Sequence, residues 1–224
     1  MLSALKQVIR KSLPNLFLQP QGEKGVRKVG HRKYIGGAWD EIGKLQFDFL
    51  VSLGLQPQHR LLDIACGSFR LGVKAIPYLD AGNYLGIEKE QSLIDLGKEH
   101  ELGAGLLAEK RPELVCSASF EFERFRQQPD FAIAQSLFTH LPGDLVNMCF
   151  AKLRPAMKPH SRFYATYFLR RPGFRNPEKA HDHGFFAFDQ PEMEAFGTRN
   201  GFVANYIGDW NHPRKQMIVE YHLA

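Results

Sequence analysis

Residues 60–72, with the sequence RLLDIACGSFRLG, decide the fold of this chain. Arg60–Ala65 is predicted as a short apolar strand, and the turn Cys66-Gly67-Ser68 leads into a helix near Arg70–Tyr78. The glycine lets the backbone approach a ligand, and the helix N-terminus offers free N–H groups. In an open α/β sheet, ligands bind beyond the carboxyl ends of the strands. This stretch therefore predicts both the fold class and the position of its site.

Strands and helices alternate along the rest of the chain. Further strands are predicted at Tyr84–Glu88, Leu114–Ser117, Phe131–Gln135 and Arg162–Leu169, and helices at 38–53, Gln91–Leu102 and Leu145–Arg154. This alternation implies right-handed crossovers and parallel strands. The tail differs, with a helix at 189–200 and strands at Val203–Ile207 and Gln216–His222. We predict a doubly wound, mostly parallel seven-stranded sheet with an antiparallel C-terminal strand and helices on both faces.

The composition excludes several classes of protein. The chain has 224 residues, 44% of them hydrophobic and 24% charged, which suits one folded α/β domain. No apolar run approaches the roughly 18 residues of a membrane span. Its three cysteines form no CxxC pair, which argues against a disulfide scaffold or a cysteine-rich zinc site. We expect a reduced, cytoplasmic setting.

The formal charge of +5 is concentrated near the N-terminus. The body of the chain is close to neutral, which argues against nucleic acid as a partner, because such binding needs positive charge across a folded face. Residues 19–33 are polar and glycine-rich, so we predict a linker there. We divide the chain into a basic arm and linker, residues 1–33, and one domain, residues 34–224.

The arm carries a short amphipathic pattern. Leu2, Leu5, Ile9 and Leu13 fall on one helical stripe, with basic residues away from it. We favour docking of this stripe on the body of the domain. The alternative is weak contact with an anionic membrane surface.

Two carboxylates indicate a nucleoside site. Glu88 ends the second predicted strand, 25 residues after Asp63, where a carboxylate can accept two hydrogen bonds from a ribose diol. A dinucleotide site needs the pattern GxGxxG, but Phe69 stands where its second glycine belongs. Asp63 also repels phosphate and suits a ligand with a cationic amine. A nicotinamide dehydrogenase is therefore the weaker alternative.

The motifs LLDIACGSF, YLGIEKE and PDFAIAQSLFTHL resemble the class I S-adenosylmethionine-dependent methyltransferases. The resemblance covers roughly residues 34–224, including the last predicted strand, KQMIVEYH. That family usually has glycines at alternate positions after the acid. This chain keeps Asp63 and Gly67 but has Ala65 and Phe69 at glycine positions. The resemblance implies S-adenosylmethionine as the cofactor.

The resemblance assigns donor-binding roles to residues at the strand ends. Asp63 would hold the methionine amine, directly or through water. Ala65, Cys66 and Gly67 would pass their backbone close to the donor, and Glu88 would bind the ribose hydroxyls.

Further donor contacts follow from the same resemblance. Lys89 would flank the adenosine, Ser119 and Phe120 would lie along the adenine, and Gln135 would face the methionine portion. A lid segment before the first strand would cover the donor, with the residues Tyr34, Gly36 and Trp39.

Histidines are the candidate catalytic residues. A hydroxyl acceptor needs a general base, and histidine is the usual one. His140 follows the fourth predicted strand, and Asp209 precedes His212 by three residues, so that an Asp–His pair can orient a base. We therefore predict catalytic roles for His140, His212 and Asp209. The His-Asp-His run at 181–183 has no accompanying carboxylate cluster, so we predict no metal.

The acceptor is expected to be a small molecule. Enzymes of this fold that methylate exocyclic amines often carry Asn/Asp-Pro-Pro-Tyr/Phe after the fourth strand, but here the sequence is Gln135-Ser136-Leu137-Phe138. We therefore predict O-methylation of a sugar or a secondary metabolite. The alternatives are an RNA or protein methyltransferase, and a non-catalytic S-adenosylmethionine-binding protein.

Overall fold

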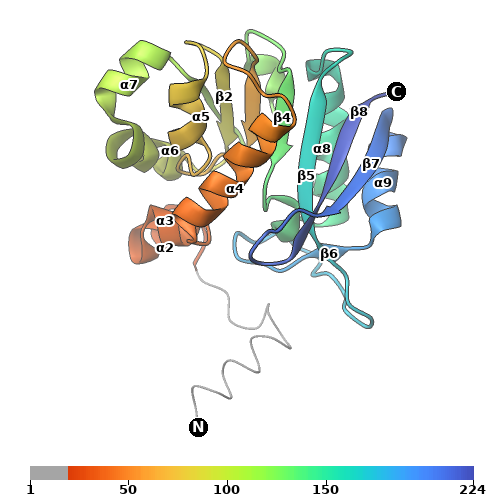
Figure 1. Ribbon diagram of the computed structural model, residues 1–224. Coiled ribbons are helices and arrows are strands. Elements are labelled where there is room, and N and C mark those ends of the chain that lie inside the picture. The colour runs from red at the N-terminus through yellow and green to blue at the C-terminus, as the bar shows by residue number, and fades with distance from the viewer. Residues whose placement is uncertain (1–19) are drawn as a thin grey trace.

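The structure, a computed structural model, describes residues 20–224. The amphipathic stripe predicted between Leu2 and Leu13 lies outside the described residues. Figure 1 shows an α/β fold in which one twisted sheet runs through the centre and helices pack on it from two sides.

One sheet of eight strands organises the molecule. Its main path has the order β3-β2-β1-β4-β5-β8-β7. The first five strands of this path are parallel, and β8 lies antiparallel between β5 and β7. The strands are β1 (Leu61–Ile64), β2 (Tyr84–Glu88), β3 (Glu113–Cys116), β4 (Phe131–Ala134), β5 (Arg162–Leu169), β6 (Ala187–Phe188), β7 (Phe202–Asp209) and β8 (Gln216–Leu223).

The predicted fold class is confirmed, with one added strand. The two-residue strand β6 pairs in parallel with the end of β5, off the main path of the sheet. This strand has only two residues, too few to show the alternation of buried and exposed side chains that predicts a strand. The order of strands reverses at β1, because the chain first builds outward to β2 and β3 and then returns to β4 on the other side. This reversal places a ligand site at the carboxyl ends of β1 and β4.

Helices cover both faces of the sheet (Figure 1). The predicted helix at 91–102 is α6 followed by one π-helical segment, and a further helix, α7, follows it. The helices are α2 (Gly22–Val29), α3 (His31–Tyr34), α4 (Trp39–Ser52), α5 (Gly72–Tyr78), α6 (Gln91–Gly97), the π-helix Lys98–Leu102, α7 (Gly103–Lys110), α8 (Gly143–Leu153) and α9 (Gln190–Arg199).

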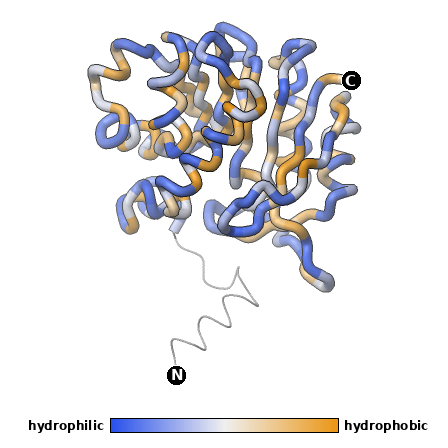
Figure 2. The backbone as a smooth tube through the Cα atoms, viewed as in Figure 1, coloured by the Kyte–Doolittle hydropathy of each residue, from blue (hydrophilic) through white to orange (hydrophobic). Residues whose placement is uncertain are grey.

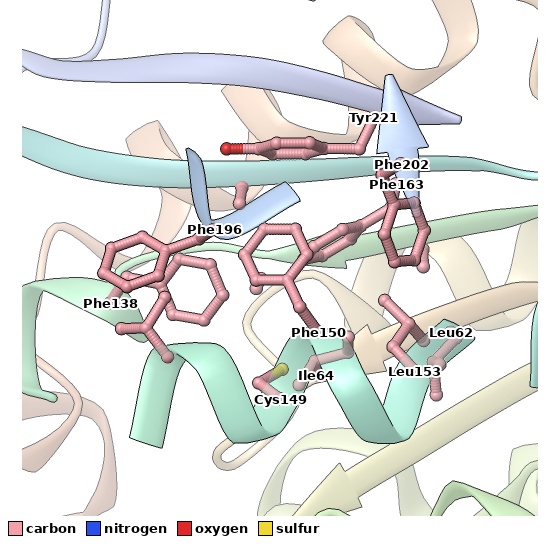
Figure 3. Close-up of a cluster of buried hydrophobic side chains, with 14 of the residues drawn as sticks. Leu62, Ile64, Phe138, Cys149, Phe150, Leu153, Phe163, Phe196, Phe202 and Tyr221 are labelled. Carbon is pink, nitrogen blue, oxygen red and sulfur yellow. The ribbon is translucent and has the colours of Figure 1, made fainter. Parts of the chain in front are cut away.

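Alternate residues of the strands pack into two hydrophobic cores, one on each face of the sheet. Leu62 joins the core beneath α8 and α9, whereas Leu61 joins the core beneath α4, α5 and α6. In the first core the ring of Phe150 lies 4.8 Å from Tyr221 and 5.4 Å from Phe163, centroid to centroid (Figure 3). Aromatic pairs at these spacings add to the free energy of burial. The two cores hold the central strands rigidly, and with them the strand ends that carry the site.

The segment predicted as a linker contains two helices. Val26 of α2 is fully buried and packs with Tyr34 and with Leu93 of α6. Arg32 donates two hydrogen bonds of 2.6 Å to the Glu101 carboxylate. Most of this segment is polar, and Figure 2 shows its hydrophilic colour broken by hydrophobic positions. One buried valine and one ion pair do not produce a repeating pattern of hydrophobic residues, so the sequence does not indicate a helix here.

The division of the chain at residue 33 stays a prediction. Within residues 20–224, none of the helices has the length and hydropathy that crossing a membrane requires.

Candidate active site

A cavity of about 520 Å³ opens at the carboxyl ends of β1, β2 and β4. Pockets of this size accept molecules the size of a nucleoside derivative. Most of the predicted site residues line it, although they come from segments spread along the chain. They are Tyr34, Gly36, Asp63, Ala65, Cys66, Gly67, Glu88, Lys89, Phe120, Gln135 and His140.

Asp63 lies in the cavity wall at the end of β1, with 4% of its surface exposed. Its Oδ2 accepts a 2.7 Å hydrogen bond from the hydroxyl of Tyr84, and its Oδ1 has no partner among residues 20–224. Burial raises the pKa of Asp63 to about 6. The carboxylate is ionised at neutral pH and incompletely compensated, which favours a cationic ligand group beside it.

Glu88 is held rigidly at the end of β2. Its Oε2 accepts a 3.0 Å hydrogen bond from the N–H of Gly67, and its Oε1 accepts from the N–H groups of Lys89 and Glu90 at 2.9 and 3.0 Å. Burial raises the pKa of Glu88, and these backbone donors oppose the rise. A carboxylate has about four lone-pair positions. Glu88 therefore keeps acceptor capacity for a hydroxyl pair while its orientation is fixed.

The loop after β1 has the backbone of a glycine-rich turn without all the glycines. Ala65, Gly67 and Phe69 have φ values of 60°, 57° and 72°. Phe69 is fully buried and packs into the core beneath α5, where it contacts Gly97 and leaves the cavity clear. Left-handed backbone costs about 1–2 kcal/mol at a residue with a Cβ. The left-handed backbone of Ala65 and Phe69 occurs in a loop that faces the cavity, and strained backbone of this kind is common in loops that bind a ligand.

His140 lines the cavity beyond β4, in a short 3₁₀ turn. Its Nδ1 lies 2.6 Å from the carbonyl oxygen of Gly184, and a carbonyl can only accept, so Nδ1 carries the proton. Nε2 is then the acceptor, with no partner among residues 20–224. Burial lowers the pKa of His140 to about 4. His140 is therefore a neutral imidazole at physiological pH, with a free lone pair.

Gln135 connects the cavity to a buried polar network. Its Oε1 accepts a 2.5 Å hydrogen bond from Arg70, and its Nε2 lies 3.1 Å from Nε2 of His212. His212 is fully buried behind Gln135, against Trp210, and does not line the cavity. The structure places His212 where it positions Gln135, away from any acceptor in the cavity.

Besides His212, three more predicted site residues lie apart from the cavity. The Asp209 carboxylate is exposed and accepts from the N–H of Asn211, so the expected Asp209–His212 pair does not form. The chain turns at Asn211, which has φ of 64°, and this turn directs Asp209 away from the buried His212. Trp39 is buried beneath Arg32, whose guanidinium lies 4.8 Å from its ring centroid, and Ser119 is exposed.

A clasp, defined as Tyr34, Lys89 and Asp182, joins three distant segments across the cavity. The Asp182 carboxylate accepts from the Tyr34 hydroxyl, the Lys89 ammonium and the N–H of Gly22. Burial opposes ionisation of Asp182, but these donors together lower its pKa. The clasp connects the loop between β5 and β6 to the N-terminal helices. Asp182 belongs to the run considered above as a possible metal site.

Two arginines of the cavity wall are absent from the sequence prediction. Arg70 is 6% exposed, and burial together with the charge of Arg214 lowers its pKa to about 10. Arg214 lies on the loop between β7 and β8 and donates to the carbonyl of Gly36. Arg70 lies only three residues after Gly67, so its place in the cavity wall could have been predicted from its closeness to the loop after β1. Nothing local in the sequence indicates that Arg214 reaches the same cavity.

Candidate metal ligands do not gather in the described part of the chain, where no group of three His, Cys, Asp or Glu side chains is arranged to hold an ion. Cys66 is a free thiol in the cavity wall, and burial raises its pKa well above the usual value. The cavity therefore offers two fixed carboxylates, Asp63 and Glu88, the ion pair of Lys89 with Asp182, three imidazoles that include the neutral His140, and two guanidinium groups.

Solved structures with the same fold were found. The magnesium protoporphyrin IX methyltransferase of Synechocystis PCC 6803 with bound SAH is 13% identical, with a TM-score of 0.64 over 98% of this chain and 100% of that one. The CcbJ methyltransferase of Streptomyces caelestis is 13% identical, with a TM-score of 0.65 over 85% and 92%. The mitomycin 7-O-methyltransferase MmcR is 17% identical, with a TM-score of 0.60 over 81% and 54%.

No protein-family model matches the sequence. The structural matches have low sequence identity, so they establish the fold alone. The chain has the fold of the class I S-adenosylmethionine-dependent methyltransferases.

Proposed function

We propose that the chain is an S-adenosylmethionine-dependent methyltransferase that acts on an oxygen of a small molecule. The observation that carries the proposal is the pair of buried carboxylates at adjacent strand ends, Asp63 and Glu88, in one cavity. Solved structures of the same fold with bound SAM or SAH support the identity of the donor.

The residues present fit the donor. Asp63 offers an unpartnered, ionised carboxylate oxygen to the methionine amine, and Glu88 offers its remaining lone pairs to the ribose hydroxyls. Gly67 brings the backbone close to the ligand. Phe120 lines the cavity beyond β3, where the adenine is expected. Ser117, rather than the exposed Ser119, is the serine that lines this part of the cavity.

The sulfonium of the donor, when bound, supplies an already activated methyl group. The protein then needs to align the acceptor oxygen and take up its proton. His140 is suited to receive this proton at Nε2, because its Nδ1–H is fixed on the Gly184 carbonyl. Gln135, oriented by Arg70 and His212, faces the same space. Apolar residues of this half of the cavity exclude water from the acceptor; they are Leu137, Leu141, Leu145 and Phe168.

The first test is isothermal titration with S-adenosylhomocysteine. We expect micromolar binding, about −8 kcal/mol. Glu88→Gln should weaken it about 10- to 100-fold, because hydrogen bonds to a charged group contribute about 1.5–3 kcal/mol. Glu113→Gln is the matched control, since Glu113, the first residue of β3, also accepts a backbone N–H bond but lies outside the cavity.

The outcomes separate the proposed function from its alternatives. Absence of binding by the wild-type protein would remove the methyltransferase proposal. Binding without transfer of a labelled methyl group to any member of a panel of hydroxylated small molecules would support a non-catalytic donor-binding protein. Transfer to RNA or protein in the same assay would favour those acceptors.

A further inference from the structure

Only some of the charged side chains that line the cavity form ion pairs within residues 20–224. Lys89 is paired with Asp182. Arg70 and Arg214 also line the cavity, but neither forms an ion pair with a carboxylate of residues 20–224. Unpaired cations in a protein cavity favour an anion as the missing partner.

The two guanidinium groups approach one another at a single turn. Arg70 donates from Nη1 to the carbonyls of Ile35 at 3.3 Å and Gly37 at 3.0 Å, and Arg214 donates to the carbonyl between them, that of Gly36. Carbonyl groups satisfy donors but do not cancel charge. The buried Nε of Arg70 has no partner within the described residues. Two like charges are thus held together at one end of the cavity, and a bound anion would relieve their repulsion.

The inference rests on the proposed function, because the donor itself brings charges. S-adenosylmethionine carries two cationic groups and one carboxylate. Asp63 lies in the same loop as Arg70, so the amine and the carboxylate of the donor match these two neighbours. One carboxylate accounts for one arginine. Arg214 is left without a counterion after the donor is bound.

Arg214 belongs to the acceptor side of the cavity. It lies on the loop between β7 and β8, far in the sequence from the donor loop, and its backbone nitrogen lies 3.2 Å from Nδ1 of His212 behind Gln135. The positive charge of Arg214 makes a small contribution to the low pKa of His140, after the larger effects of burial and of His183. A group bound by Arg214 would therefore lie in the part of the cavity that holds the candidate base.

We propose that the methyl acceptor carries an anionic group, a carboxylate or a phosphate, which Arg214 binds. Arg214 is exposed at the mouth of the cavity, so the anionic end of the acceptor points outward. The apolar wall that includes Leu141 and Phe168 takes the body of the acceptor. An aromatic or aliphatic acid with a hydroxyl group fits this arrangement, and a neutral sugar does not.

The test uses the full chain saturated with S-adenosylhomocysteine, which fills the donor's own carboxylate position. Benzoate and phenyl phosphate are titrated into this complex by calorimetry, with benzyl alcohol as the neutral probe of similar shape. We expect an anionic probe to bind at least about tenfold more tightly than benzyl alcohol, as one charge-assisted contact provides. The tighter of the two anions identifies the carboxylate or the phosphate as the source.

Variants locate the bound anion. With S-adenosylhomocysteine kept at saturation, Arg214→Gln should weaken binding of the anionic probe about tenfold. Arg70→Gln should instead weaken S-adenosylhomocysteine. Arg199→Gln, on an exposed arginine at the end of α9 and outside the cavity, should change neither. Raising the salt concentration should weaken the anionic probes, since an exposed charge is screened.

Two results would overturn the proposal. One is equal binding of the anionic and neutral probes, and the other is anion binding that Arg214→Gln leaves unchanged. Both require that S-adenosylhomocysteine binds, so they are distinct from failure of the proposed function. If S-adenosylhomocysteine itself does not bind, the proposed function fails, and the anionic acceptor that rests on it fails too.

Discussion

The two halves of the cavity are built in different ways. The donor half is formed by the ends of β1 and β2, where Asp63 and Glu88 are fixed by short-range hydrogen bonds. The acceptor half combines His140, the loop that carries Asp182 and the loop that carries Arg214. The donor half is acidic and local, and the acceptor half is basic and assembled from distant segments. Changes in the two halves should therefore have separable effects on donor binding and on turnover.

The largest expected effect comes from the candidate base. His140→Gln keeps a donor for the Gly184 carbonyl but removes the basic nitrogen. We expect the rate of methyl transfer to an accepted substrate to fall about 10²- to 10⁴-fold. The affinity for S-adenosylhomocysteine should stay within twofold, as measured by calorimetry. His160→Gln, on an exposed histidine, is the control.

The pH dependence of His140 follows from its burial. Its pKa is lowered to about 4, so the unprotonated base is present above that pH. The contribution of His140 to the rate should stay constant between pH 6 and 8 and decline only as the pH falls through about 4. An unchanged rate for His140→Gln would contradict its role as the base.

Asp63→Asn should separate stability from binding. The folded-state pKa of Asp63 is raised to about 6 from 3.8, so an ionised Asp63 at pH 7 destabilises the fold by up to about 3 kcal/mol. The amide still accepts the Tyr84 hydroxyl. Urea unfolding at pH 7 should show a more stable variant, while S-adenosylhomocysteine binds more weakly.

The sign of this effect gives a second check. A raised carboxyl pKa means that the folded wild-type protein gains stability as the pH falls through 6 toward 4. The stability difference between Asp63→Asn and the wild type should therefore shrink at pH 5. Asp80→Asn, on an exposed acid, should show no such trend. A variant that is less stable at pH 7 would argue against a strained carboxylate.

Breaking the clasp tests whether contacts in the acceptor half slow the dissociation of the bound donor. Asp182→Ala removes the partner of Tyr34 and Lys89. We expect dissociation of S-adenosylhomocysteine to accelerate about tenfold, because one charged hydrogen-bonded contact contributes about 1.5 kcal/mol. Stopped-flow fluorescence measures this rate, and Tyr34→Phe should give a smaller change. Equal dissociation rates in all three proteins would show that the clasp does not cover the donor.

The smallest effect is expected at the strained loop. Ala65→Gly should stabilise the protein by up to about 1 kcal/mol, because relief of the left-handed backbone exceeds the added entropy of the unfolded chain. Ala132→Gly, in the buried strand β4, should destabilise it instead. Thermal unfolding compares the two variants. A loss of stability in Ala65→Gly would contradict strain at this position.

The sequence predicted the parts of the site that depend on local pattern. The β1 strand, its turn and α5 follow one another directly, so hydrophobic runs and Gly67 were enough to place Asp63 and the donor loop. Glu88 ends the next strand, and parallel strands bring their carboxyl ends to one edge. The departure of the tail from the alternation of strands and helices also predicted the antiparallel β8.

The same reasoning misplaced residues whose contacts depend on a turn or on packing. Asp209 and His212 are close in the sequence, yet the turn at Asn211 leaves one exposed and the other buried. The polar segment around α2 is helical because Val26 packs on α6, a contact that composition does not show.

The sequence by itself determined the fold class, the position of the cavity and the carboxylates Asp63 and Glu88, because these follow from hydrophobic period and strand order. The tertiary structure alone decided the clasp and the basic end of the cavity. Asp182 lies 148 residues from Tyr34, and Arg214 lies 178 residues from Gly36. Contacts of this range leave no periodic signal in the chain, since they arise only after the sheet has brought its loops together.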